Sequence, residues 1–212
     1  MWMRWLESAA WAVGLLLLAS YAGMRGWVAE SSAQAVIEFH EFGTKSADQS
    51  LWSPRRVAAY AEAQRRGEAP EALLRIPSLP LEVPVYRDTS ELNLDRGAGR
   101  IPGTAGLDEP GNVGIAAHRD GFFRKLKDAA IGMSLFLEHD GRTLRYHVTE
   151  ISIVSPEDAS VLAPTSRPSL TLVTCYPFYF VGSAPQRYVV RAELDEAQTR
   201  NEAPVKPHRR ET

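Results

Sequence analysis

The feature that most constrains the fold is a series of short β-type segments, separated by prolines and glycines, that begins near residue 73. Asp140-Gly141 stands between two of these segments, and this dipeptide is typical of tight hairpin turns. Short strands with such turns and few helices predict an all-β barrel or sandwich. We therefore expect one β domain over residues 72–195. The predicted strands cover residues 74–76, 81–86, 113–117, 134–138, 142–154, 169–174 and 187–194.

The charge balance argues against a nucleic-acid partner. The formal net charge of the 212 residues is -2, and lysines and arginines are scattered among acidic residues rather than gathered into a patch. The sequence contains 1 cysteine, Cys175, so no intrachain disulfide and no cysteine-based metal site can form. No metal or other cofactor is expected.

The N-terminus carries an apolar segment, since residues 8–24 have no charged side chain and are bounded by Glu7 and Arg25. Its length falls within the range of about 17–25 residues that a membrane-spanning helix needs. We predict a transmembrane anchor over residues 1–30, in the cell (inner) membrane, with the rest of the chain on the extracytoplasmic side. A cleaved signal peptide that ends near Ala33-Gln34-Ala35 is the alternative.

Residues 31–71 are predicted to form a helical stalk or linker between the anchor and the β domain. Ser53 is suited to cap a helix, Pro54 fits its first position, and the residues that follow are rich in helix formers. A helix that docks on the domain instead of standing away from it is the alternative. Residues 196–212 are charged and are expected to be a disordered tail.

Two of the predicted strands end in residues with reactive side chains. Residues 113–117 lead into His118, and residues 169–174 lead into Cys175. A thiol is a useful nucleophile as its thiolate, which a nearby imidazolium stabilises while it offers a proton to a leaving amine. The two strand ends together indicate thiol-dependent acyl transfer.

Acyl transfer also needs a positive charge or N–H groups that face the developing oxyanion. Arg187 opens the last predicted strand and can supply a permanent charge, but Arg191 shares its face of the strand, and spacing alone does not rank the two. A structural role is the alternative for each residue of this set: a buried thiol, a structural imidazole or a solvated arginine.

Five segments of the chain resemble the sortase family, in the family's order and over about residues 72–194. The segment Thr171-Leu-Val-Thr-Cys175 matches the Thr-Leu-x-Thr-Cys signature of the family. The other four are Gly111-Asn-Val-Gly-Ile-Ala-Ala-His118-Arg, Val83-Pro-Val85, Gly99-Arg-Ile-Pro-Gly-Thr104 and Arg187-Tyr-Val-Val-Arg-Ala.

The resemblance implies an eight-stranded sortase-type β-barrel with short helices, in which the catalytic cysteine, histidine and arginine fall on Cys175, His118 and Arg187. Sortases cut a C-terminal Leu-Pro-x-Thr-Gly-like sorting signal between Thr and Gly, hold the acyl group on the cysteine and pass it to an amine. The implied partners are a surface protein with such a signal and an amine acceptor in the cell wall or elsewhere.

The resemblance also implies a groove beside the nucleophile. Thr174, directly before Cys175, would line it, and residues 176–182 would lie in the connecting loop that borders it, so that Tyr176 and Phe178 are expected to bind substrate.

Two details bear on the subgroup within the family. Arg100 stands where many relatives carry a histidine, so the secondary role proposed for that histidine does not transfer. The run from Cys175 to Arg187 resembles class D sortases and the single sortases of Gram-negative bacteria, and the long helical lead-in favours the latter. Some relatives use calcium, but Asp108 and Glu109 are only a weak indication of a calcium site in this sequence.

Of three rival functions, two remain open at this point. A thiol protease would use the same acyl-enzyme but pass the acyl group to water. An L,D-transpeptidase would carry a His-Gly and Ser-x-Gly-Cys pattern that the sequence lacks. A non-enzymatic adhesion or scaffold barrel would merely bury Cys175.

Overall fold

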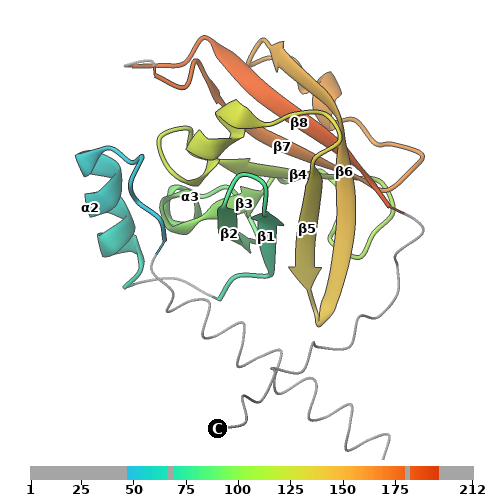
Figure 1. Ribbon diagram of the computed structural model, residues 1–212, viewed down its shortest axis with the longest axis horizontal. Coiled ribbons are helices and arrows are strands. Elements are labelled where there is room, and N and C mark those ends of the chain that lie inside the picture. The colour runs from blue at the N-terminus through green and yellow to red at the C-terminus, as the bar shows by residue number, and fades with distance from the viewer. Residues whose placement is uncertain (1–46, 66–68, 180–181, 196–212) are drawn as a thin grey trace, which may run out of the picture. The chain divides into compact units, whose positions relative to one another are not determined.

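The computed structural model of the chain describes residues 47–65, 69–179 and 182–195 (Figure 1). In this part of the chain eight strands close into a barrel in the order β1-β2-β3-β4-β7-β8-β6-β5. The strands are β1 (Ala72–Ile76), β2 (Leu81–Tyr86), β3 (Ala98–Arg100), β4 (Asn112–Ala117), β5 (Ser134–His139), β6 (Arg142–Val154), β7 (Ser169–Tyr176) and β8 (Gln186–Leu194). The helices are α2 (Pro54–Ala63), α3 (Glu91–Arg96) and two 3-10 helices, η1 (Phe122–Asp128) and η2 (Ala159–Leu162).

The barrel confirms the predicted all-β class and adds one strand to the seven predicted segments. Asp140 and Gly141 have φ angles of 47° and 70°, and this double left-handed turn joins β5 to β6 as the sequence predicted. The missing strand is β3, which has three residues, among them a glycine. So short a segment shows no periodicity of its own, and its neighbours in the sheet define it.

Strand alternation divides the side chains of β7 between the core and the outer face of the barrel. Leu170 and Leu172 are 0% exposed and belong to the hydrophobic core. Val173 and Cys175 point the other way, and both are partly exposed. The outer face of β7 is therefore the face that can present a reactive side chain.

The parallel pairing of β4 with β7 brings two strand ends to the same edge of the barrel. The register runs from Asn112 beside Ser169 to Ala116 beside Val173. On its other side, β7 pairs antiparallel with β8. Because β4 and β7 run in the same direction, the residues that follow them leave the sheet side by side.

The loop between β6 and β7 is tied down on the outer face of these strands. Asn112 is 1% exposed, and its Nδ2 donates to the carbonyls of Val161 (3.1 Å) and Ala163 (3.2 Å). Its Oδ1 accepts a hydrogen bond of 2.7 Å from Oγ1 of Thr171. One buried amide thus joins β4, β7 and the loop that contains η2.

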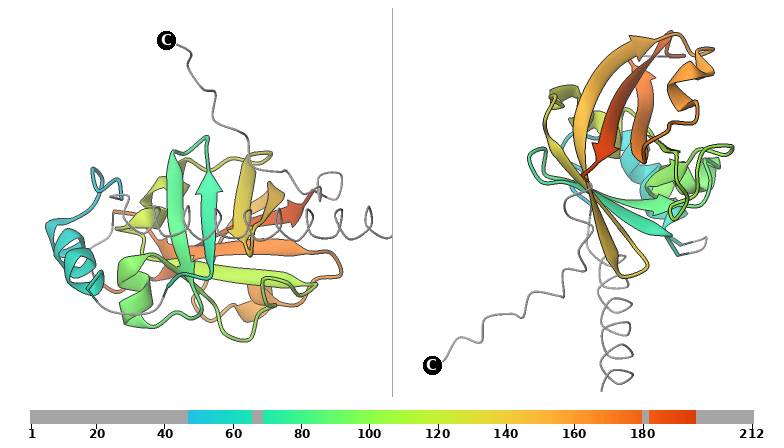
Figure 2. Two further views of the ribbon diagram at one scale, coloured as in Figure 1. Left: turned by 90° about the horizontal axis from the view of Figure 1, so that it is seen from below. Right: turned by 90° about the vertical axis from the view of Figure 1, so that its right-hand side faces the viewer.

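The predicted helix before the barrel is present and packs against the domain. Ser53 caps α2 by accepting from the backbone N–H of Arg56, and Pro54 is its first residue. In all three views of Figures 1 and 2, α2 lies beside α3, which it contacts. Its contacts are those of the docked alternative, so residues 54–63 are not a free stalk.

The predicted anchor and the predicted tail lie outside the described residues, as do residues 31–46 and 66–68 of the predicted linker. Within the described ranges, no helix has the length and apolar character that crossing a membrane requires.

We predict that Asn112→Ala lowers the free energy of unfolding by about 2 kcal/mol, because it leaves the buried hydroxyl of Thr171 without its acceptor and removes both hydrogen bonds to the β6–β7 loop. Urea unfolding measures the loss. The matched control is Ser166→Ala, an exposed residue of the same loop, which should change stability by less than about 0.5 kcal/mol. Equal effects of the two substitutions would contradict the anchoring role of Asn112.

Candidate active site

The register of β4 and β7 brings His118 and Cys175 together. Continued by two residues beyond the pair Ala116 and Val173, it sets His118 beside Cys175. Neighbouring strands lie about 5 Å apart, and alternation puts both side chains on the outer face. A buried hydrogen bond of 2.8 Å from Thr174 Oγ1 to the carbonyl of Ala117 fastens the two strand ends to each other. The register therefore puts the first two members of the predicted site on neighbouring strands and on the same face.

Arg187 is the third member, and the structure distinguishes it from Arg191. Cys175 and Arg187 are directly opposite each other in the β7–β8 pairing, so their side chains share the outer face. Arg191 lies opposite Thr171, and its Nη2 donates to the carbonyl of Val161 in the β6–β7 loop. Arg187, not Arg191, is placed beside the thiol.

The side chain of Arg187 is oriented by the backbone at the start of its own strand. Its Nη1 donates to the carbonyl of Gln186 (3.0 Å) and to that of Ala184 (3.4 Å). These two acceptors are neutral carbonyls, and the permanent charge of the guanidinium is also felt by the carboxylate of Glu157. Cys175, which is partly exposed and carries a free thiol, lies across from Arg187.

The imidazole of His118 is surrounded by charges that the sequence did not reveal. Its Nε2 is shielded from solvent, makes no hydrogen bond to the described residues, and lies 3.8 Å from Glu91 Oε1 and 3.8 Å from Asp95 Oδ1. Burial, followed by the positive charge of Arg56, lowers the pKa of His118, while the carboxylates of Glu91, Asp120 and Asp95 oppose the shift. Burial prevails, and the resting imidazole is therefore biased toward its neutral form.

Local sequence signals could have found part of this cluster. Glu91 and Asp95 are four residues apart on α3, a spacing that puts two side chains on one face of a helix. Nothing in the sequence relates Arg56 to His118, because α2 reaches the barrel through tertiary packing alone.

The three residues expected to bind substrate are placed differently from one another. Thr174 is 3% exposed and holds Ala117, and Phe178 is 7% exposed within the hydrophobic core. Tyr176 is partly exposed and stacks on Tyr188, with the ring centroids 6.1 Å apart. Alternation sets Thr174 and Tyr176 on the opposite face from Cys175. Their contact with substrate stays a prediction, and Tyr176 is the member with exposed surface to make it.

The segment after β7 is held against the turn that carries His118. Arg119 donates from Nη1 to the carbonyl of Pro177 (3.2 Å) and from Nη2 to that of Gly182 (2.9 Å). Arg124 donates from Nη1 to the carbonyl of Phe178 at 2.8 Å. The backbone on the cysteine side and the backbone on the histidine side are therefore coupled.

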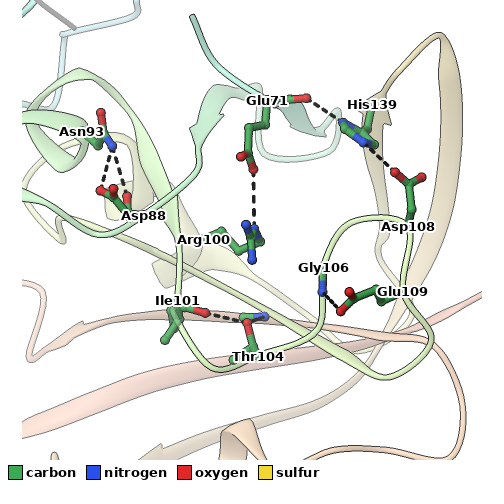
Figure 3. A network of polar contacts seen from close by, with 11 residues as sticks. Glu71, Asp88, Asn93, Arg100, Ile101, Thr104, Gly106, Asp108, Glu109 and His139 are labelled. Carbon is green, nitrogen blue, oxygen red and sulfur yellow. Dashed lines mark hydrogen bonds and ion pairs between the residues drawn. The ribbon is translucent and has the colours of Figure 1, made fainter. Parts of the chain in front are cut away.

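Asp108 and Glu109, the weak indication of a calcium site, both contact other groups of the protein (Figure 3). Asp108 lies 3.1 Å from Nε2 of His139, and Glu109 accepts the backbone N–H of Gly106 at 2.8 Å. In the same region Arg100 faces Glu71, with Nε 3.5 Å from Oε2. These contacts tie the β3–β4 loop to the β1–β5 side of the barrel.

Among the described residues, one group has atoms close enough together to hold a metal ion, namely Glu91, Asp95 and His118, whose potential ligand atoms lie within 4.8 Å of one another. Oδ1 of Asp95, which faces His118, also accepts from Nη1 of Arg56. A guanidinium on that oxygen repels a cation, so we treat the group as a charge cluster around the imidazole.

Comparison with known proteins points to one family. A model of the sortase domain family matches residues 74–195. The chain is 26% identical to sortase D of Bacillus subtilis (strain 168) over 179 residues, which cover 82% of this chain and 90% of that protein. It is 27% identical to sortase A of Bacillus anthracis over 169 residues, which cover 77% of this chain and 79% of the relative. The likeness to sortase D is consistent with the class D resemblance of the sequence.

Solved structures share the fold. The complex of Streptococcus agalactiae sortase C1 with MTSET superposes with a TM-score of 0.58 at 23% identity, over 74% of this chain and 96% of that one. A Clostridium perfringens sortase D5 transpeptidase gives a TM-score of 0.56 at 21% identity, over 78% and 99% of the two chains.

The lowered pKa of His118 predicts how stability depends on pH. The folded protein binds the imidazole proton less readily than the unfolded chain, whose histidine titrates near the ordinary value of 6.5. The stability associated with neutral His118 is therefore present above about pH 6.5 and is lost as the pH falls through the lower, folded value. We expect the wild type to lose more stability than His118→Gln between pH 7.5 and pH 5, as measured by urea unfolding. If the wild type instead lost less stability than His118→Gln over this range, the pKa of His118 would be raised and not lowered.

Proposed function

Because this chain belongs to the sortase family, whose members are cysteine transpeptidases that anchor surface proteins, we propose that Cys175, His118 and Arg187 are its nucleophile, its acid/base and its oxyanion-stabilising group. The observation that carries the proposal is the pairing of β7 with both of its neighbours. Beside Cys175 on one side it sets His118, and on the other side Arg187.

In the first half of the reaction, the sulfur of Cys175 attacks the carbonyl carbon of the Thr–Gly bond in a Leu-Pro-x-Thr-Gly-like signal. The carbon–nitrogen bond breaks, and the departing glycine amine takes a proton that His118 supplies. The product is a thioester between Cys175 and the threonine carbonyl. His118 can receive the thiol proton in this step because its lowered pKa leaves the resting imidazole biased toward the neutral form.

In the second half, an amine attacks the thioester carbonyl and passes its proton to His118, while the carbon–sulfur bond breaks and the thiol forms again. Both halves place a negative charge on the same carbonyl oxygen. Arg187 lies on the outer face opposite Cys175 and carries a charge that no pH in the working range removes. Its place on that face supports an electrostatic role in each half.

The substrate of this reaction is a surface protein with a C-terminal sorting signal, and the acceptor is an amine in the cell wall or elsewhere. The uncharged run over residues 8–24 supports anchoring in the cell membrane, with the catalytic domain on the extracytoplasmic side. Tyr176, the last residue of β7 and partly exposed, is the group we assign to contact the sorting signal. Phe178 packs against its ring, and Thr174 holds the strand end to Ala117.

Transfer can be separated from hydrolysis by incubating the protein with a sorting peptide, with and without an added amine. We expect a Cys175 thioester in the intact-protein mass spectrum, and an amine-linked product that replaces hydrolysed peptide as the amine concentration rises. Cys175→Ala and His118→Ala should abolish both products while the fold survives. If the amine leaves the product distribution unchanged, the protein is a hydrolase and not a transferase.

Arg187→Ala should lower the rate of acyl-enzyme formation by about 10²–10³, the scale of losing one oxyanion donor. Arg191→Ala is the matched control, because it removes the same side chain from the same face of β8 but four residues further from the level of the thiol. Arg191→Ala should lower the rate of acyl-enzyme formation by a much smaller factor. A loss of less than about tenfold for Arg187→Ala would argue against its assigned role.

A further inference from the structure

The charges around His118 come from three parts of the fold. α2 contributes Arg56, α3 contributes Glu91 and Asp95, and the turn after β4 contributes Asp120. The thiol of Cys175 on β7 and the guanidinium of Arg187 on β8 are on the same outer face. Three carboxylates and one arginine therefore act on an imidazole that must exchange a proton with the thiol.

Arg56 is connected to two of these carboxylates. Its Nη1 forms an ion pair with Oδ1 of Asp95, and its Nε lies 3.3 Å from Oδ1 of Asp120. The side chain of Arg56 is 14% exposed and that of Asp95 is 19% exposed, so water screens this pair far less than a pair on the open surface. The same oxygen of Asp95 is the one that lies 3.8 Å from the imidazole.

The position of Arg56 is fixed by the packing of α2 and the residues before it. Trp52 meets the ring of Phe122 in η1 edge to face at a centroid distance of 4.8 Å, and Tyr60 meets it at 6.0 Å. Lys125 of η1 pairs with Asp48 at 2.7 Å. Figures 1 and 2 show α2 beside α3 in each view. α2 is therefore held on two sides.

The stem of Arg56 also lies next to the turn that begins with His118. A Cβ atom at Gly121 would lie 3.6 Å from Cδ of Arg56, an ordinary van der Waals distance. The backbone N–H of Gly121 donates to the carbonyl of His118 at 3.2 Å and closes the turn. Arg56 thus lies beside the turn that follows His118 as well as on the carboxylates around its ring.

Without a cation between them, these carboxylates would act directly on His118. A carboxylate within about 4–6 Å stabilises an imidazolium and holds its proton. Such a pair would hold the imidazolium beside α3, where its Nε2 lies 3.8 Å from both Glu91 and Asp95, as a fixed ion pair. The positive charge of Arg56 is the second cause, after burial, of the lowered pKa of His118.

We propose that Arg56 is a positioning residue for the transfer reaction: it engages Asp95 and Asp120, keeps them from capturing the imidazole of His118, and leaves the ring free to exchange a proton with Cys175. The inference rests on the proposed function, because it presupposes that His118 is the acid/base. It assigns to α2, a helix outside the barrel, a direct part in setting the state of the active site.

The test follows the titration of the His118 imidazole by NMR in the full chain. In Arg56→Met, which keeps the length of the stem but removes the charge, His118 should titrate about one pH unit higher than in the wild type. Arg55→Met is the matched control, because Arg55 is the preceding residue of the same helix and is exposed. It should leave the titration unchanged.

Two further variants separate the charge of Arg56 from its packing. In Arg56→Met/Asp95→Asn the titration should return toward the wild-type value, because the carboxylate that captures the ring is gone. Asp95→Asn alone should shift it below the wild-type value, a result that does not require Arg56→Met to fold. A His118 titration that is unchanged or lowered in Arg56→Met, or a double variant that is not restored, would overturn the proposal.

The pH dependence of peptide transfer provides the second readout. The limb of the profile that His118 sets should move to higher pH in Arg56→Met by the same amount as the NMR titration. If the titration shifts as expected but the wild type transfers no peptide, the proposed function fails while the electrostatic role of Arg56 stands. If the wild type transfers peptide and the titration does not move, the role of Arg56 fails by itself.

Discussion

The parallel pairing of β4 with β7 is the constraint on which the rest of the site depends. It lets two strands that are far apart in the sequence end side by side. His118 directly follows β4, and Cys175 is the second-last residue of β7. A slip of one residue would turn Cys175 toward the barrel interior, because side chains alternate strictly along a strand. The buried bonds from Thr174 to Ala117 and from Thr171 to Asn112 oppose such a slip.

The same pairing explains why the reactive groups are on the outer face. The inward side chains of β7 fill the core, where Leu170 and Leu172 are completely buried. The outward ones are free to carry chemistry, and the adjacent strands supply partners from both sides. A closed barrel holds these strands at fixed spacing, so the geometry of the site follows from backbone hydrogen bonding more than from side-chain packing.

Local patterns predicted much of this structure, and tertiary contacts account for what they missed. Asp140-Gly141 encodes its own turn, and Ser53 with Pro54 encodes the start of α2, because both signals act within a few residues. β3 escaped prediction, since three residues become a strand only when neighbours pair with them.

The candidate site divides in the same way. His118 and Cys175 could be picked out because each ends an apolar strand. The spacing of Arg187 and Arg191 did not rank the two arginines, and the register of β8 with β7 does. The partnership of Arg56 with Asp95 joins residues that are 39 positions apart. No periodicity or motif reports a contact of that kind, because it arises from how α2 packs against α3.

The most direct test of the account is a covalent bridge between the two strand ends. A short bifunctional alkylating reagent such as dibromoacetone reacts first with a thiol and then with a nucleophile about 5 Å away, the spacing of neighbouring strands. After digestion of the treated native protein, mass spectrometry should find the peptide of Cys175 joined to the peptide of His118, and no such bridge in His118→Ala. A bridge from Cys175 to another histidine, or reagent attached to Cys175 at one end only, would contradict the arrangement from which the mechanism is derived.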